Sequence, residues 1–410
     1  MENVPTVQKR PSVSDPAMES FLEWPATQYE QVMWNPDEEF DSLGNTHERG
    51  NYFANVPPKI EKTDFAIPSS LGSAVTRVSQ LIAEFDNEHG EILSPFTAML
   101  LRSEAAASSE IENLSASPRS ILQAEIGIST GGNAEQIAAN TDAMRLAVES
   151  ADELSLAGIL EMHKILMSRQ RSVPAGVLRE VPVWIGGRSP VSASMVGVES
   201  RNLEAAMNDL LLFIKRDDIP TLMKAALAHA HFENIHPFED GNGRTGRALV
   251  HSMLRKEGVT KNSLVPISAG LLTAPQRYYQ ALDFYREGNA GPIVTLFVES
   301  ATTAVRNARQ LSDDILKTKE MWKVKLGTIR SDSSVWKVLT YLSGTPVITI
   351  QSGLNHLDIS QTSLYDSLNL LETRGVLARS GSREKTQWRS IELLDALDRF
   401  AIRAGRRSKK

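Results

Sequence analysis

The 410-residue sequence contains no cysteine. Disulfide bonds, catalysis by a thiolate and zinc sites built from cysteine are therefore excluded. This absence does not by itself decide the compartment. No apolar run is long enough to span a bilayer, and the first residues lack the apolar core of a secretory signal. We therefore expect a cytoplasmic protein with no membrane partner.

A surplus of positive charge is also lacking. The sequence has 44 Lys and Arg residues against 50 Asp and Glu residues, a formal net charge of −6. No overall attraction to nucleic acid or to an anionic membrane follows from this balance. With 41% hydrophobic and 23% charged residues, the composition is that of an ordinary soluble protein. A chain of this length is able to fill two or three hydrophobic cores.

The most informative segment is HPFEDGNGRTGR, residues 236–247. Pro237 disfavours a helical backbone at His236, so the helix predicted for TLMKAALAHAHFENI should end there. Asn242 is suited to cap a new helix that begins at Gly243. The segment is therefore predicted to be a loop that leads into a helix N-terminus. Unpaired backbone N–H groups and the helix dipole make such a terminus a binding site for anions, and glycines let the anion approach closely.

Four side chains of this segment carry chemistry. Arg244 and Arg247 lie three residues apart, on roughly one face of the predicted helix, and two guanidinium groups suit a polyphosphate. His236 is able to accept a proton from a hydroxyl at neutral pH. Asp240 is placed to hold a Mg²⁺ ion that bridges phosphate oxygens. Each residue alone has an ordinary structural explanation, but the ordered string predicts transfer of a phosphorus-containing group to a hydroxyl.

The segment resembles the signature of the Fic family, H-P-F-x-[D/E]-G-N-[G/K]-R-x-x-R. Its specified positions are met by His236, Pro237, Phe238, Asp240, Gly241, Asn242, Gly243, Arg244 and Arg247. The resemblance implies a protein adenylyltransferase, which moves AMP from ATP to a Ser, Thr or Tyr hydroxyl of a target protein and releases diphosphate. Family members that phosphorylate a translation factor carry a small residue and lysine at the positions of Gly241 and Gly243. Their absence favours adenylylation here.

The resemblance also implies a role for each position. His236 is the base, and Asp240 holds Mg²⁺. The remaining positions bind the triphosphate of ATP: Asn242 and Gly243 line the anion hole for the α-phosphate, Arg244 and Arg247 contact the β- and γ-phosphates, and Gly241, Thr245 and Gly246 lie beside them.

Residues 108–113, SSEIEN, resemble the family's inhibitory-helix pattern [S/T]-x-x-x-E-[G/N] at Ser108, Glu112 and Asn113. In the family this glutamate pairs with the second arginine of the signature, here Arg247. A carboxylate bound to that guanidinium competes with the γ-phosphate, so ATP binds without presenting its α-phosphate for in-line attack. Ser108, one turn before Glu112, is placed to orient it by a hydrogen bond. The pattern predicts an autoinhibited enzyme whose inhibitory helix lies N-terminal in the same chain.

Two further segments resemble the family more loosely. Residues 179–188, REVPVWIGGR, alternate toward a Gly-Gly turn and predict a β-hairpin. In Fic proteins a hairpin flap at this place covers the nucleotide and pairs with the target's backbone. The flap positions that would contact ATP are Ile185, Gly186, Gly187 and Arg188. Residues 277–286 follow where the family has an adenine-side wall, which implies contacts from Tyr278 and Tyr279, although one of them could equally belong to the core.

Helical apolar spacing dominates the chain, so we expect a mainly α fold: a Fic-type helical core with a β-hairpin flap, followed by a small winged helix-turn-helix domain. The predicted parts are an N-terminal arm packing on the core (1–68), a helical region with the inhibitory helix (69–130), the Fic catalytic core (131–304), a linker helix (305–330), a winged-helix domain (331–398) and a basic tail (399–410). His163 lies on a predicted core helix and is expected to pack. His229 and His231 are expected to pack or to support groups of the site, rather than to bind a metal.

The C-terminal segment 335–391 predicts three helices and a two-stranded wing with its turn near Ser380–Lys385. The second helix of the helix-turn-helix would begin with Ser360, Gln361, Thr362, Ser363 and Tyr365. It carries Asp366 and Glu372 against a single Arg374. Basic residues instead gather in the wing and tail, at Arg383, Lys385, Arg389, Arg406, Arg407, Lys409 and Lys410. Contact with DNA phosphates and a protein-docking or dimerising role are therefore both open.

Three functions compete. The main hypothesis is an autoinhibited AMP transferase that uses ATP and Mg²⁺ and acts on a target protein with an acceptor hydroxyl. The first alternative is removal of AMP from a modified target, because Glu112 is also suited to orient a hydrolytic water. The second is a DNA-binding regulator whose Fic core senses a nucleotide. A homodimer is a further expectation.

Overall fold

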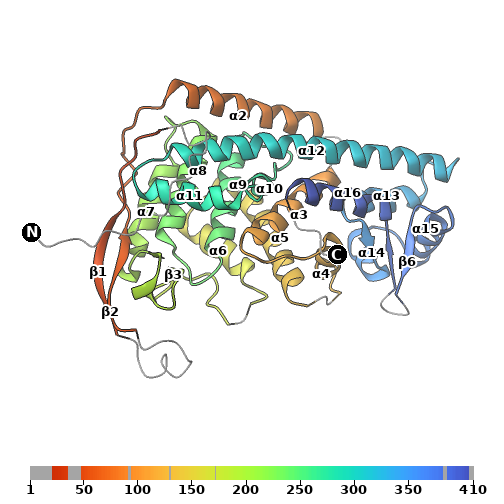
Figure 1. The fold of residues 1–410 in the computed structure, drawn as a ribbon. Coiled ribbons are helices and arrows are strands. Elements are labelled where there is room, and N and C mark those ends of the chain that lie inside the picture. Colours follow the sequence, from red (N-terminus) through yellow and green to blue (C-terminus); the bar gives the residue numbers. More distant parts are fainter. Residues whose placement is uncertain are drawn as a thin grey trace, which may run out of the picture.

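The structure, a computed structural model, describes residues 21–35, 48–90, 94–128, 131–170, 172–381 and 386–405, without the side chains of 89, 90 and 94–96. The described chain is mainly helical, as the apolar spacing predicts (Figure 1). At its centre lie α8 (Thr221–Ile235) and α9 (Asn242–Lys256), which are joined by the HPFEDGNGRTGR loop. Every residue of α8 after its first is buried. A helix enclosed on all sides is held by packing rather than by its own propensity.

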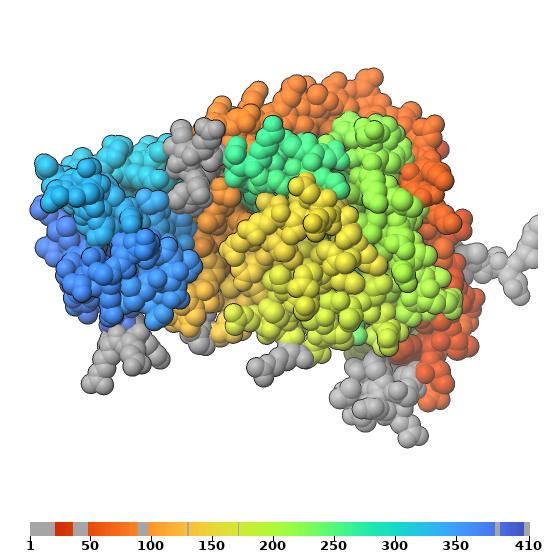
Figure 2. Space-filling model, turned by 180° about the vertical axis from the view of Figure 1, so that it is seen from behind, coloured from red at the N-terminus to blue at the C-terminus, as the bar shows by residue number. Residues whose placement is uncertain are grey.

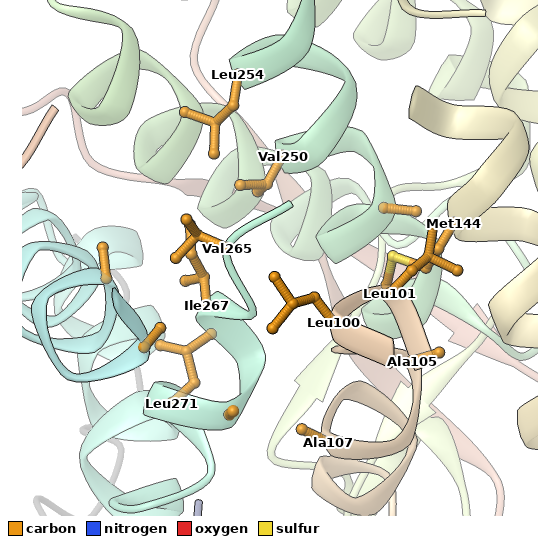
Figure 3. Packing of buried hydrophobic residues seen from close by; sticks show 14 of the residues in the cluster. Leu100, Leu101, Ala105, Ala107, Met144, Val250, Leu254, Val265, Ile267 and Leu271 are labelled. Carbon is orange, nitrogen blue, oxygen red and sulfur yellow. The ribbon is translucent and has the colours of Figure 1, made fainter. Parts of the chain in front are cut away.

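The other core helices pack around this central pair. In direct contact with α8 or α9 are α3 (Ser94–Ile111), α5 (Asn133–Glu149), α6 (Leu156–Leu166), α7 (Leu203–Ile214), α11 (Pro275–Arg286) and α12 (Gly291–Leu326). The short α10 (Ile267–Leu271) lies between α3 and α12, while α2 (Ser69–Gly90) packs along α12 (Figure 1). Figure 3 shows Leu100 and Leu101 of α3 facing Val250 of α9 and Met144 of α5 in this core. The predicted inhibitory helix is thus an integral core helix.

Two β-hairpins lie side by side at one end of the molecule. The first pairs β1 (Gln28–Trp34) with β2 (Gly50–Val56), a hairpin that the sequence analysis did not predict within its N-terminal arm. The second pairs β3 (Trp184–Ile185) with β4 (Met195–Val196), at the place predicted for the flap. Tyr52 of β2 and Val196 of β4 share a small apolar cluster, so the two hairpins support each other. Short 3₁₀ turns complete this region and the helix connections, at Ala151–Glu153 (η2), Pro190–Ser192 (η3) and Ser200–Asn202 (η4).

The linker helix expected from residue 305 is the second half of α12, which runs without a break from Gly291. It leads to a C-terminal unit, residues 334–403. This unit comprises α13 (Ser334–Gly344), β5 (Val347–Ile348), α14 (Ile350–His356), α15 (Gln361–Thr373), β6 (Ala378–Ser380), β7 (Gln387–Arg389) and α16 (Ile391–Arg403). The two strands expected for the wing, β6 and β7, pair antiparallel, and β5 adds a third strand that was not predicted, so the sheet order is β5-β7-β6. Most of the wing turn and the end of the basic tail, including Arg383, Lys385, Arg406, Arg407, Lys409 and Lys410, lie outside the described residues.

The C-terminal unit and the N-terminal hairpin occupy opposite ends of the molecule. Figure 2 shows the unit in blue at one end and the hairpin in red at the other, with the yellow and green segments between them. The last helix, α16, turns back onto the core and packs on α12, α3 and α4 (Pro118–Glu125). Among the helices that the structure describes, none has the length and apolar character required to cross a membrane.

Candidate functional site

The loop between α8 and α9 has the backbone that its sequence predicts, with one correction. His236 adopts a left-handed backbone, φ 54°, immediately before Pro237, and α8 ends at Ile235. Asn242 was expected to cap α9 but is its first residue; the cap position belongs to Gly241, at φ 80°. The side chain of Asn242 instead closes the loop, since its Oδ1 accepts from the N–H of Phe238 and its Nδ2 donates to the carbonyl of Phe238, at 2.9 and 2.8 Å. A left-handed backbone favours glycine at position 241.

Arg179 fastens this loop to the flap. Its Nε donates to the carbonyl oxygen of His236 at 2.8 Å, and its other nitrogens donate to the carbonyls of Val181 and Val198. Burial lowers the pKa of Arg179 to about 10, so the guanidinium remains charged at neutral pH. From the sequence, Arg179 was expected only to be part of a hairpin. Nothing in the local pattern indicates that it would reach across to His236.

The ring of His236 is held as a neutral base. Its Nδ1 lies 3.2 Å from the carbonyl oxygen of Glu233 and 3.7 Å from the Glu233 carboxylate. A carbonyl only accepts, so Nδ1 carries the hydrogen and Nε2 keeps its lone pair. Burial lowers the pKa of His236 to about 4. Unprotonated Nε2 is therefore ready to accept a proton at neutral pH.

Glu233 is a second buried ionisable group that the sequence analysis missed. Burial, and then the nearby carboxylate of Glu112, raise its pKa to about 7. Its Oε1 lies 3.4 Å from the hydroxyl of Tyr278 and 3.9 Å from Nε2 of His229. His229 also contacts that hydroxyl, at 2.9 Å, and is fully buried. These contacts agree with a packing role for His229, and they place a carboxyl group beside the site.

The N-terminus of α9 offers groups that fit an anion. Arg244 is buried, and its Nε and Nη1 have no hydrogen-bond partner within the described chain. Its Nη2 lies 3.3 Å from Oδ1 of Asp240. Two unpartnered N–H groups of a buried guanidinium are costly unless a ligand accepts from them. With the free N–H groups of the first helical turn, they fit phosphate oxygens.

Asp240 fits a Mg²⁺ ion that also contacts phosphates. Its side chain is 43% exposed, with Oδ2 accepting from Gln170 at 2.9 Å and Oδ1 from the N–H of Gly241 at 2.6 Å. No group of three His, Cys, Asp or Glu side chains suited to a metal occurs within the described residues. Mg²⁺ commonly uses one or two carboxylates together with water and substrate phosphates, so a single aspartate is compatible with it.

The structure brings the predicted inhibitory residues onto Arg247. Glu112, in the turn after α3, accepts from Nη2 of Arg247 at 2.8 Å. From the sequence, the hydroxyl of Ser108 was expected to donate a hydrogen bond to Glu112. In the structure this hydroxyl accepts instead from Nε of Arg247 at 2.9 Å, and the Ser108 carbonyl accepts from Nη2 of Arg247 at 2.7 Å. The backbone of Asn113 is left-handed, φ 62°, which ends the helical run.

Glu112 also covers the first turn of α9. A Cβ atom added to Gly243 would lie 2.0 Å from Oε1 of Glu112. The carboxylate therefore occupies the space in front of the helix N-terminus where an anion would bind. A group bound in front of Gly243 would have to displace this carboxylate. Thr245 and Gly246 are buried one turn further into α9, and a Cβ on Gly246 would meet the ring of His229.

The two tyrosines expected to face adenine differ in environment. Tyr278 is 2% exposed, and its hydroxyl lies 3.4 Å from Nη1 of Arg247. Tyr278 therefore supports the arginine from within the core, which is the alternative noted for one of the pair. Tyr279 is 46% exposed and donates to the carbonyl of Ile111, the last residue of α3. Of the two, only Tyr279 presents ring surface to a ligand.

The flap positions form the exposed tip of the β3-β4 hairpin. Ile185 is 49% exposed, and Gly186 and Gly187 both have φ near 71°. A Cβ on Gly187 would lie 2.5 Å from the carbonyl of Ser192, so this turn requires glycine. The N–H of Arg188 donates to the hydroxyl of Ser192 at 3.1 Å. The chain leaving β4 passes close to the signature loop, because a Cβ atom added to Gly197 would lie 3.0 Å from Cβ of His236.

Two parts of the chain match known protein families. Residues 153–254 match the Fic/DOC family and residues 73–149 match the Fic/DOC family N-terminal domain. "Protein adenylyltransferase fic-1" of Caenorhabditis elegans is 29% identical over 41% of this chain and 32% of its own length. "Protein adenylyltransferase Fic" of Drosophila erecta is 30% identical over 36% and 28%. The chain thus spans about a third of the length of these curated relatives.

A solved structure shares the fold. The crystal structure of a Fic family protein from Desulfovibrio desulfuricans G20 aligns with a TM-score of 0.53 and 20% identity, covering 82% of this chain and 98% of that one. The signature at 236–247 lies within the first matched region and the SSEIEN segment within the second. Residues 153–254 therefore carry a Fic/DOC domain, preceded at 73–149 by the N-terminal domain of that family, as the sequence predicts.

Proposed function

We propose that the protein is an autoinhibited protein adenylyltransferase, which transfers AMP from ATP to a hydroxyl of a target protein. The observation that supports this most is the pair of arginines at the α9 N-terminus. Arg244 has unpartnered N–H groups, and Arg247 is bound by Glu112. One guanidinium is ready for an anion while a carboxylate blocks the other. The names of the curated relatives point to the same activity.

The chemistry follows from the positions of the polar groups. The target's hydroxyl oxygen forms a bond to the α-phosphorus of ATP, and its proton passes to Nε2 of His236. The bond between the α-phosphorus and the bridging oxygen breaks, and diphosphate leaves. Arg244 and Arg247 hold the β- and γ-phosphates and set the line of attack. Mg²⁺ held by Asp240 would neutralise charge on the phosphates.

The family match does not establish whether AMP or the γ-phosphate of ATP is transferred. The position of the label in ATP is therefore the direct test. The Glu112→Gly protein is incubated with Mg²⁺, a lysate of candidate targets, and ATP labelled at either the α- or the γ-phosphate. Protein-bound label from α-labelled ATP alone is the expected result. Label from the γ-phosphate would make the protein a kinase. Release of AMP from a previously modified target, without transfer, would favour the reverse reaction.

A further inference from the structure

A buried histidine outside the signature touches the main chain of the aspartate assigned to Mg²⁺. His163 lies on α6 and is fully buried. Its Nδ1 accepts from the N–H of Gly176 at 2.9 Å, and its Nε2 lies 3.0 Å from the carbonyl oxygen of Asp240. A backbone N–H only donates and a carbonyl only accepts. The ring is therefore neutral, with its hydrogen on Nε2 and directed at Asp240.

The ring is also fixed in orientation. It stacks face to face on Phe238, with ring centroids 3.7 Å apart and an interplanar angle of 2°. Phe238 is itself held at both its N–H and its carbonyl by Asn242. A Cβ on Gly241 would lie 3.5 Å from Cδ2 of His163, so the ring also borders the left-handed residue that caps α9. One side chain thus contacts two residues of the loop, Asp240 and Phe238, and lies beside a third.

We propose that His163 is a positioning residue for the metal-binding carboxylate. By holding the carbonyl of Asp240, its Nε2–H sets the direction in which that residue's side chain leaves the loop. This inference rests on the proposed function, since it assumes that Asp240 takes Mg²⁺ with ATP. It extends the site to α6, a helix outside the signature, and replaces the packing role expected from the sequence.

Binding calorimetry separates positioning from packing. ATP is titrated with and without Mg²⁺ into Glu112→Gly proteins that also carry His163→Phe or His163→Gln, with His231→Phe as the control for loss of a buried histidine. His163→Phe keeps an aromatic ring but loses both hydrogen bonds. We expect it to weaken Mg²⁺-dependent ATP binding about tenfold or more, with Mg²⁺-free binding nearly unchanged. His163→Gln, which retains an N–H donor, should recover part of the loss.

Each other outcome has a definite meaning. The positioning role is overturned if Mg²⁺ strengthens ATP binding to His163→Phe as much as to the parent protein, or if His163→Phe weakens ATP binding equally with and without Mg²⁺. It is also overturned if His231→Phe loses as much Mg²⁺-dependent ATP affinity as His163→Phe. If the parent Glu112→Gly protein gains no affinity for ATP from Mg²⁺, the proposed function fails and the inference fails with it. Thermal unfolding of each variant shows whether it is folded.

A second, independent observation concerns α3, which links Glu112 to the C-terminal unit. Arg102 of α3 donates to the carbonyl of Gly344 and to the hydroxyl of Thr345, the latter at 3.2 Å. Its Nε pairs with Glu125 of α4 at 2.6 Å, in an ion pair that is nearly buried. Glu112 lies ten residues further along the chain, about 15 Å away by the helical rise.

The contact between the two parts of the chain is broad. A narrow cavity is lined by Ala106 of α3, Ile121 and Leu122 of α4, and Leu397 and Phe400 of α16. Gln123 donates to Gln387 at 2.9 Å across the same interface. The side chains of α3 therefore touch the C-terminal unit at one part of the helix and Arg247 at its end. The helix is therefore a continuous physical connection between the two places.

We infer that docking of the C-terminal unit on α3 keeps Glu112 in its blocking position, and this too rests on the proposed function. The test is a double-mutant cycle of AMP transfer with the parent chain, Arg102→Gln, Glu112→Gly and the double variant. Arg102→Gln should raise transfer several-fold when Glu112 is present and leave it unchanged when Glu112 is absent. Arg309→Gln, which breaks an exposed ion pair between α12 and α2, is the control.

The cycle distinguishes the inference from the function itself. If AMP transfer by Arg102→Gln is unchanged, or if it changes equally with and without Glu112, the coupling is overturned but the transferase activity still stands. A rise of the same size in Arg309→Gln would show a general loosening and would also overturn it. Lack of transfer by Glu112→Gly would remove both the function and the coupling. A lower unfolding temperature without increased transfer counts against the inference.

Discussion

Replacement of His236 by alanine is expected to lower AMP transfer about 10³-fold, because the target's hydroxyl then has no base to accept its proton. The change is made in the Glu112→Gly chain, where transfer is measurable. ATP binding should remain within a few-fold of the parent, since the ring contacts no group assigned to the phosphates. The measurement is incorporation of α-label together with binding calorimetry.

The pH dependence of transfer gives an independent check on His236. Burial lowers its pKa to about 4, whereas a free histidine titrates near 6.5. The base is deprotonated above its pKa, so protonation of His236 should remove activity only as the pH falls toward 4. Glu233, whose pKa burial raises to about 7, changes charge between pH 6 and 8 and is the source of any smaller change there. A nearly complete loss of transfer already at pH 5 would contradict the buried position of the His236 ring.

A matched control is available on the same helix. His231 is buried on α8, and its Nδ1 contacts the hydroxyl of Tyr285 at 2.9 Å, away from the signature loop. His231→Phe should retain transfer within a few-fold. If both variants lost activity equally, the effect of His236→Ala would be structural, and His236 would lose its role as the base.

Replacement of Glu112 by glycine is expected to raise AMP transfer about 10- to 100-fold. Removing the carboxylate frees Nη2 of Arg247 for a phosphate and clears the space in front of Gly243. A hydrogen bond to a charged group contributes about 1.5–3 kcal/mol, which corresponds to this range. Ser108 continues to hold Nε of Arg247, so the guanidinium should keep its place.

Glu110→Gly is the control for Glu112→Gly. Glu110 lies two residues earlier, in the last turn of α3, and glycine there weakens the helix by about 1 kcal/mol without removing the carboxylate on Arg247. Transfer by Glu110→Gly should change much less than by Glu112→Gly. Equal activation would mean that any loosening of α3 suffices. Unchanged transfer in Glu112→Gly would remove the autoinhibition model.

Local sequence patterns predicted much of the central region. Pro237 predicted the end of α8, and Asn242 predicted the start of the next helix to within one residue. The family assignment and the mainly helical fold were confirmed. These features are readable because they depend on local backbone preferences and on an ordered string of residues. Autoinhibition, the metal and the flap contacts stay predictions that the experiments above address.

Contacts between distant segments were not readable. Arg179 reaches the carbonyl of His236, and His163 reaches that of Asp240, across 57 and 77 residues of sequence. Asn55 of β2 donates to Asn234 at the end of α8 across 179 residues. Each of these side chains sits in a segment whose own pattern indicates only a hairpin, a core helix or an arm. Each of them donates to a main-chain carbonyl, and a carbonyl leaves no trace in the sequence.

The sequence by itself therefore determined which groups could do the chemistry: a base, an acid, glycines at a helix N-terminus and two arginines, all within 236–247. Only the tertiary structure decided their state. Burial makes His236 a neutral base, and folding leaves Nε and Nη1 of Arg244 without a partner among the described residues, while the packing of α3 places Glu112 on Arg247. The reason is physical: desolvation and the pairing of charges depend on neighbours brought together by folding, not on adjacency along the chain.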